Sequence, residues 1–244
     1  MTKIDIFCII KKKELTNIKH IINQEPQIER PFALGMCYDK LFWLFVIGNI
    51  VGCIVETIWC IATTQTFQMR VGLVIGPFIP IYGVGAVLIT VSLYKIMHKN
   101  DILIFICSGL IGGIFEYLCS WLQEIIFHTV SWDYSDTPFN FNSRTNLMFI
   151  LCWGFLGLIW IRLIYPHISQ MIERIPRAVG KTLTGILTAF FIFDILLSVT
   201  AQIRKNIRNE FHQPPKTVIG EFMDIVFPDE VLNFLFPNMT PTDK

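Results

Sequence analysis

Five long apolar stretches dominate this 244-residue chain. Each is close to the ~20 residues that an α-helix needs to cross about 30 Å of hydrocarbon. Only helices or closed barrels satisfy their whole backbone inside a bilayer, and runs of this length indicate helices. The stretches are roughly residues 41–62, 73–93, 102–126, 147–165 and 182–201. The sequence therefore predicts an all-α fold, a polytopic transmembrane helical bundle with about five membrane segments.

The composition agrees with a chain surrounded by lipid. Hydrophobic residues make up 53% of the chain and charged residues only 16%, against roughly 25% charged residues in soluble domains. The formal net charge of +1 creates no field that would favour nucleic acid as a partner. None of the seven cysteines forms a CxxC pair, so neither a metal site nor a redox pair is indicated, and no cofactor is expected.

The distribution of basic residues predicts the orientation and three regions. Seven Lys and Arg residues precede the first apolar stretch, so by the positive-inside rule the N-terminus is expected in the cytoplasm of a multi-pass cell-membrane protein. Residues 1–40 form a basic, amphipathic arm, residues 41–208 the transmembrane domain, and residues 209–244 a polar or interfacial tail. Four basic residues conflict with this rule, because five crossings place them outside: Arg204, Lys205, Arg208 and Lys216.

The second apolar stretch is the least regular. Pro77 and Pro80 fall in its first turns, and proline breaks a helix because it lacks the amide donor and clashes with the preceding turn. We expect this stretch to be partly re-entrant, which a membrane tolerates only where protein or water covers the backbone.

An internal repeat is also indicated. Gly48-x3-Gly52-x3-Glu56 matches Ser108-x3-Gly112-x3-Glu116 at an offset of 60 residues, and Pro77-Phe78 matches Pro138-Phe139 at an offset of 61. Two parallel two-helix repeats would result, and membrane transporters commonly place their binding sites at such repeat interfaces.

Three helices each offer one acidic group. A charge at the centre of a membrane helix is costly, so such a residue is a functional candidate by default. By helical periodicity Asn49 shares a face with Glu56, and Ser198 shares a face with Asp194. We predict that Glu56, Glu116, Asp194, Asn49 and Ser198 line a polar interior for protons or for a cationic or hydrogen-bonding solute. The alternative is a structural polar cluster that is protonated or hydrogen-bonded.

The loop of residues 127–146 holds the remaining candidates. Trp132, Asp133, Tyr134, Asn140 and Arg144 lie close together after the Glu116 helix. Trp and Tyr favour membrane interfaces, so an aromatic belt is one interpretation. The other is a lid over the cavity, closed by an ion pair between Asp133 and Arg144.

Known catalytic and nucleotide-binding signatures are missing from the sequence. Gly180-Lys181-Thr182 looks like the end of a phosphate-binding loop, but Ile175 stands where that pattern needs a glycine. No GxSxG or HExxH string occurs. We assign no catalytic residue and regard an enzyme as the less favoured reading.

Several short motifs together resemble one family. They are the Glu56 helix, GPFIPIYG at 76–83, the Glu116 helix, WDYS at 132–135, PFN at 138–140, Trp153-Gly154, and Asp194-x3-Ser198 with Arg204. On these motifs, residues about 41–208 resemble the bacterial ABC-transporter type IV permeases, the CmpB-like family. The chain departs from the family pattern at Ser143, where glycine is usual, and at Ile75, where a polar residue is usual.

The resemblance implies the membrane subunit of a transport system in the cell membrane. A separate ATPase subunit would then supply energy and dock on loop 94–101 or 166–181, and the chain could also form a homo-oligomer. Two alternatives stay open. One is a membrane-embedded enzyme for a lipid substrate, with the same carboxylates as acid and base. The other is a non-catalytic membrane partner protein whose polar faces hold helices together.

Overall fold

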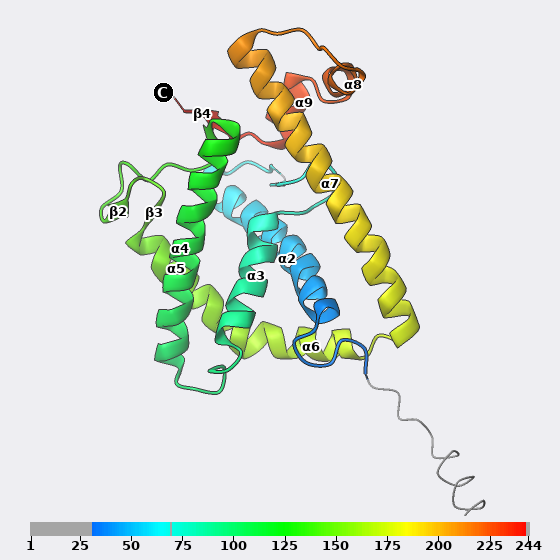
Figure 1. The fold of residues 1–244 in the computed structure, drawn as a ribbon. Helices are drawn as coiled ribbons and strands as arrows, with labels where there is room; N and C mark the ends of the chain where they lie inside the picture. The colour runs from blue at the N-terminus through cyan, green and yellow to red at the C-terminus, as the bar shows by residue number, and fades with distance from the viewer. Residues whose placement is uncertain (1–30, 69, 243–244) are drawn as a thin grey trace, which may run out of the picture. The chain divides into compact units, whose positions relative to one another are not determined.

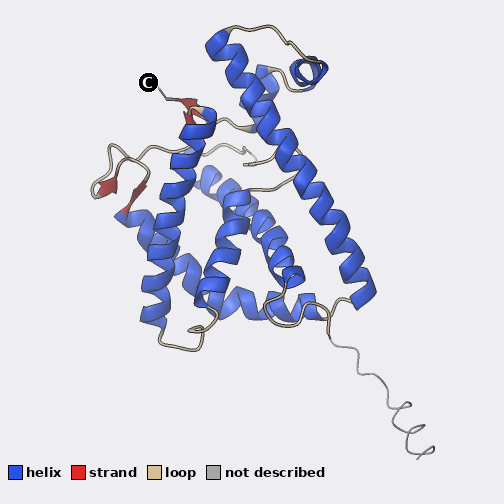
Figure 2. Cartoon of the chain, viewed as in Figure 1, coloured by secondary structure: helices blue, strands red, loops and turns tan. Residues whose placement is uncertain are grey.

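The computed structural model describes residues 31–68 and 70–242, and most of the predicted arm of residues 1–40 lies outside this range. The all-α prediction is confirmed (Figure 2). Four helices in the described part are long and apolar enough to cross a membrane: Tyr38–Thr64, Asp101–Phe127, Leu147–Glu173 and Arg177–Asn209. A fifth apolar helix, Pro80–Leu93, is shorter.

Two helical hairpins and one long helix make up the membrane part. Helices α2 (Tyr38–Thr64) and α3 (Pro80–Leu93) form the first hairpin, and α4 (Asp101–Phe127) and α5 (Leu147–Ile159) form the second. In Figure 1, α2, α4 and α7 (Arg177–Phe211) run upward, whereas α3 and α5 run downward. Helix α5 continues through a π-helical turn, η1 (Trp160–Ile164), into α6 (Tyr165–Glu173).

Ion pairs join the helices at the end where α2 begins. Lys40 is fully buried and pairs with Glu173 of α6 at 2.6 Å. Lys181, from the string that resembles a phosphate-binding loop, pairs with Asp39 at 2.5 Å. A buried charge is tolerated when it is paired and hydrogen-bonded, and Ser169 supplies two further acceptors for Lys40. These contacts hold α6 and α7 against the start of α2.

The second apolar stretch is interrupted, as its prolines predict. Helix α3 begins only at Pro80 and has 14 residues, about 21 Å of helix, which is less than the hydrocarbon thickness. The backbone before Pro80 is irregular, and its amides find partners elsewhere: the N–H of Val74 donates to Ser198 Oγ at 2.9 Å, and that of Ile75 to Asp194 Oδ1 at 3.2 Å. Protein therefore satisfies the non-helical backbone here, as a membrane environment requires.

The two hairpins repeat one packing pattern. In the first, a Cβ on Gly52 would lie 2.4 Å from the Tyr82 side chain, and in the second a Cβ on Gly112 would lie 2.3 Å from Trp153. Gly48 packs on Ala86 in the same way that Ser108 packs on Gly157. The first helices of the hairpins thus correspond at an offset of 60 residues, as the sequence predicts, and the second helices correspond at an offset of 71.

The second predicted match, between Pro77-Phe78 and Pro138-Phe139, does not correspond in its contacts. Phe78 packs against Phe190 and Phe191 of α7, whereas Phe139 is 75% exposed. Part of the change of offset from 60 to 71 comes from the second connection, residues 128–146, which is longer than the first, residues 65–79, and contains a small hairpin. That hairpin pairs β2 (Asn140–Phe141) with β3 (Thr145–Asn146).

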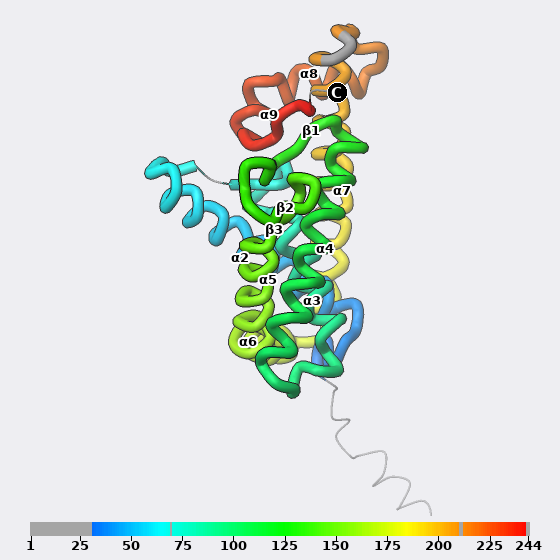
Figure 3. The backbone as a smooth tube through the Cα atoms, turned by 90° about the vertical axis from the view of Figure 1, so that its left-hand side faces the viewer, coloured from blue at the N-terminus to red at the C-terminus, as the bar shows by residue number. Residues whose placement is uncertain are grey.

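The tail folds back onto the end of α7. Helices α8 (Val218–Val226) and α9 (Asp229–Leu235) bury Met223, Leu232 and Phe236 against Ala201 of α7. Strand β4 (Thr240–Pro241) then pairs with β1 (Thr129–Val130) after α4, and Figure 3 shows the tail helices at the same end as β1.

Three of the four basic residues that conflict with the positive-inside rule belong to this contact: Arg204, Lys205 and Arg208. Arg204 pairs with Asp224, and Arg208 pairs with both Asp224 and Asp229. Lys205 donates to Asn233 Oδ1. These side chains bind the tail to α7, so their position serves the folding of the tail.

Candidate functional site

Glu56 and Tyr82 form the first half of a polar cluster between the hairpins. Glu56 lies one turn beyond Gly52 on α2, where the absence of a side chain lets α3 approach. The Tyr82 hydroxyl donates to Glu56 Oε1 at 2.6 Å. Helix α3 therefore supplies a hydrogen-bond donor for the carboxyl group of Glu56 on α2.

Glu116 forms the second half and is more deeply enclosed. It is 6% exposed. Its Oε1 accepts from the Tyr134 hydroxyl and its Oε2 from Thr145 Oγ1, each at 2.9 Å. Trp153 also lies within hydrogen-bonding range of Glu116. Since Trp153 corresponds to Tyr82 in the repeat, each hairpin places an aromatic donor beside the carboxylate of its own first helix.

The two halves meet at one site. The rings of Tyr82 and Trp153 are stacked with centroids 6.3 Å apart, which joins α3 to α5. Two carboxylates with hydroxyl and indole donors and flat aromatic rings can bind a proton or a cation, because ring faces and carboxylates both attract positive charge.

The loop after α4 closes over the Glu116 side of this cluster. Tyr134 reaches Glu116 from the loop and stacks on Phe149 of α5 with ring centroids 4.7 Å apart. Burial, and then the charge of Glu116 and its hydrogen bond, raise the pKa of Tyr134 above its ordinary value. Tyr134 therefore stays a neutral hydrogen-bond donor at physiological pH.

The predicted ion pair between Asp133 and Arg144 is wrong. Arg144 pairs with Glu124 near the end of α4 and also donates to Ser120 Oγ. Asp133 accepts from the backbone N–H of Ser135, two residues on, and so stabilises a local turn. The pairing fails because α4 brings Glu124 nearer to Arg144 than the loop brings Asp133.

Hydrogen bonds within the loop fix its shape. Trp132 Nε1 donates to the Arg144 carbonyl at 2.8 Å, and Asn140 donates to the Thr137 carbonyl and accepts from the Ser143 N–H. Ser143 has φ +60°, the left-handed region that glycine adopts without a Cβ penalty. A glycine would adopt this conformation more easily than Ser143 does.

Asp194, Ser198 and Asn49 have contacts away from the Glu56–Glu116 pair. Asp194 and Ser198 accept the backbone amides of Ile75 and Val74. Asn49 donates to the Phe45 carbonyl within α2, and a Cβ on Gly83 would collide with its amide group. All three candidates are buried, as their helix faces predict, and the described contacts of Asp194 and Ser198 support the interrupted segment.

Sequence reasoning missed three members of the cluster: Tyr82, Trp153 and Thr145. Tyr82 lies in the motif GPFIPIYG and Trp153 in the motif Trp153-Gly154, but neither was predicted as a site residue. The sequence signal that could have identified them is the offset of 71 residues between α3 and α5, the second helices of the two hairpins. Among the described residues, no group of three or more His, Cys, Asp and Glu side chains could hold a metal ion.

The fold and the cluster define a class: a polytopic helical membrane protein built on two helical hairpins with paired carboxylates between them. The particular family is given by sequence. The chain belongs to the family described as "Putative ABC-transporter type IV", which matches residues 43–199. No curated protein matches the chain. No solved structure matches it either.

Proposed function

We propose that this chain is the permease-like membrane subunit of a transport system, and that Glu56 and Glu116 hold a proton or a cationic solute between the two hairpins. The observation that supports this most is the convergence of one carboxylate and one aromatic donor from each hairpin. Parallel repeats of this kind place binding sites at their interface, and their rocking gives alternating access. Membership of an ABC-transporter family is consistent with a transport role.

The contacts of the other predicted residues suggest divided roles. Tyr134 and the loop close the site on the side of β1, which we assign to the outer face of the cell membrane. Asp194 and Ser198 keep the interrupted segment before α3 in place. Because α3 supplies Tyr82, movement of that segment would change the donor on Glu56.

In this proposal a separate ATPase subunit supplies the energy and docks on the cytoplasmic side. Helix α6 and the residues that flank it offer the surface for it, because Leu163 of η1, His167 and Met171 of α6, and Arg174 directly after α6 are exposed at helical spacing along one side. The opposite side of α6 is bound to α2 through the ion pair of Lys40 and Glu173. A displacement of α6 would therefore be transmitted to α2 of the first hairpin.

Affinity purification of the tagged chain from native membranes in mild detergent, followed by mass spectrometry, tests the partner. A stoichiometric ATPase subunit supports the proposal. Its reproducible absence from well-folded protein argues against an ABC permease and in favour of a membrane enzyme or scaffold.

Carboxylate variants test the site. Glu56→Gln and Glu116→Gln keep the size and one acceptor oxygen but remove the charge. Glu221→Gln is the matched control, because Glu221 is exposed on α8. We expect the first two variants to abolish solute movement in cells and the control to leave it unchanged. Unchanged solute profiles from well-folded Glu56→Gln and Glu116→Gln proteins would exclude this site.

A further inference from the structure

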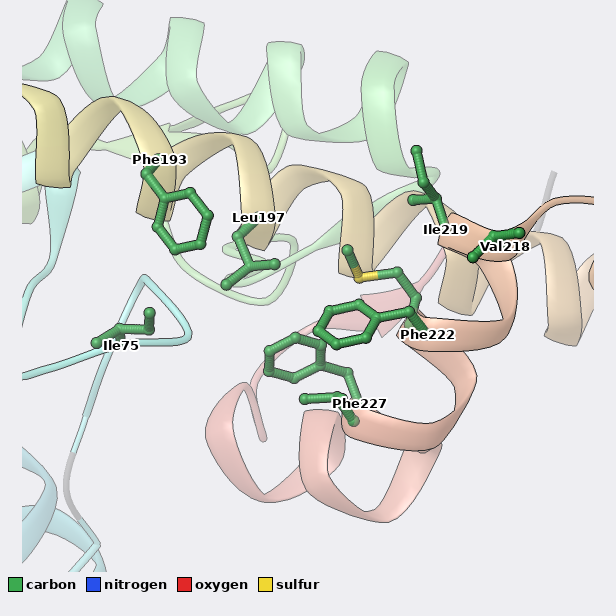
Figure 4. Close-up of a pocket in the computed structure, with 9 residues that line it drawn as sticks. Ile75, Phe193, Leu197, Val218, Ile219, Phe222 and Phe227 are labelled. Atoms are coloured by element: carbon green, nitrogen blue, oxygen red, sulfur yellow. The ribbon is translucent and has the colours of Figure 1, made fainter.

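Between α7 and α8 lies an apolar groove that the proposed function does not use. Phe193 and Leu197 of α7 form one wall, Ile219 and Phe222 of α8 form the other, and Ile75 of the interrupted segment closes one end. In Figure 4, Phe193 and Leu197 project from α7 toward the groove, and Phe193 lies farther from α8 than Leu197 does. The groove volume is about 660 Å³, within the range of roughly 300–1,000 Å³ that is usual for small-molecule sites.

The groove opens on the surface of α7 that faces lipid. Ile192, Phe193 and Leu196 are exposed large apolar residues inside the spanning part of α7. In a membrane protein, such a surface is covered by hydrocarbon chains. The groove continues this surface, so the bilayer can fill it without a separate partner.

The depth of the groove fits one leaflet. Arg204, near the polar end of α7, pairs with Asp224 of the tail. Phe193 lies eleven residues earlier on the same helix, about 16 Å deeper at 1.5 Å per residue. Half of a hydrocarbon core of about 30 Å is roughly 15 Å. A groove between these two levels therefore has the length of one acyl chain.

Ion pairs between α8 and α7 hold α8 in place as one wall of this groove. On its polar side, α8 contributes Asp224 to the pairs with Arg204 and Arg208. On the other side its apolar residues are exposed, with Ile219 at 63% and Ile225 at 80%. A short helix with one apolar and one charged face lies in the membrane interface, with its apolar face in the acyl region.

We infer that the α7–α8 groove binds the acyl chain of a bilayer lipid, with α8 lying in the interface of the same leaflet. The lipid covers the outer side of the interrupted segment at Ile75, whose backbone amide is held by Asp194 on the inner side. Helix α8 lies outside residues 43–199 that match the family, whereas Ile75, Phe193 and Leu197 lie within them.

Photolabelling of the full chain tests the inference. The protein is reconstituted in phosphatidylcholine vesicles that contain a phospholipid with a diazirine in its acyl chain. After irradiation, mass spectrometry locates the adducts. We expect adducts on Phe193 and Phe222 that saturate as the probe fraction rises. Adducts on Leu196, which faces lipid outside the groove, should rise in proportion to the probe.

Two tryptophan variants of α8 provide the matched comparison. Both Ile219 and Ile225 are exposed, but only Ile219 lines the groove. Ile219→Trp should lower the groove adducts at least threefold, whereas Ile225→Trp should leave them unchanged. Groove labelling that rises linearly like that of Leu196, or equal effects of the two variants, would overturn the inference. These results do not depend on transport, so they are separate from a failure of the proposed function.

Discussion

Replacement of Asp194 should release the interrupted segment before α3. Asp194 is fully buried, and its Oδ1 accepts from the Ile75 N–H at 3.2 Å and from Ser198 Oγ at 3.4 Å. Asp194→Ala removes this acceptor and leaves a buried amide without a partner. The expected loss is about 1–3 kcal/mol in the free energy of unfolding, the usual cost of an unsatisfied buried donor.

Asp194→Asn is the control that separates the acceptor from the charge. Asparagine keeps an oxygen for the Ile75 amide, and its NH₂ group takes the place of Oδ2, which has no hydrogen-bond partner in the described residues. Both variants remove the charge, so the difference between them measures the acceptor. We expect Asp194→Asn to lose less than about 1 kcal/mol, because the Ile75 amide keeps its acceptor.

Unfolding by sodium dodecyl sulfate in mixed micelles measures both free energies. Protease cleavage within residues 70–79 shows where the change occurs, and faster cleavage is expected in Asp194→Ala alone. Equal stabilities of the two variants, within about 0.5 kcal/mol, would mean that the Asp194 acceptor does not hold this segment, and the reasoning would be refuted.

Three further predictions concern packing, acid stability and the loop. Gly112→Ala places a Cβ 2.3 Å from Trp153 and should cost about 1–3 kcal/mol by overpacking, whereas Gly185→Ala, with no atom within 4 Å, should cost nothing in the same unfolding assay. The hydrogen bond with Arg204 is the first cause that lowers the pKa of Asp224. The ionised carboxylate therefore stabilises the fold fully above its ordinary pKa of about 3.9, and this stabilisation is lost as the pH falls through the lower folded-state pKa. Amide hydrogen exchange in α8, compared at neutral pH and at about pH 3, would detect the loss. Ser143→Gly should stabilise the loop by about 1 kcal/mol in thermal unfolding, because the serine has φ +60°.

The outcomes that contradict these predictions are specific. A stable Gly112→Ala protein would mean that α4 and α5 are not packed as closely as described. An Asp224→Asn variant with the same acid response as the wild type would exclude this carboxylate as its origin. A Ser143→Gly variant that melts earlier would show that a contact of the Ser143 side chain outweighs its backbone conformation.

The helices that cross the membrane could be predicted from sequence because hydrophobic length is a local property. The apolar stretches near 41–62, 102–126 and 182–201 correspond to α2, α4 and α7. The prolines at 77 and 80 locate the break before α3 for the same reason, since proline acts on its own turn. Burial of Glu116 and Asp194 follows from the 3.6-residue period.

Pairing between distant residues could not be predicted in this way. Asp133 and Arg144 are only eleven residues apart and of opposite charge, yet Arg144 pairs with Glu124, because α4 ends beside the loop. Asp194 shares the chemistry of Glu56, but α7 places it against the interrupted segment. Charge alone does not say which carboxylate meets which partner.

The sequence by itself determined the class of the protein, its spans, its buried faces and, through joint motifs, its family. Only the tertiary structure decided that Tyr82 donates a hydrogen bond to Glu56 and that Tyr134 and Thr145 donate to Glu116. It also decided that the tail binds α7 through the ion pair of Asp224 with Arg204. The physical reason is that apolarity and helical period act over neighbouring residues. The partners of a buried carboxylate depend instead on which helices pack together, and close packing at glycines brings those helices into contact.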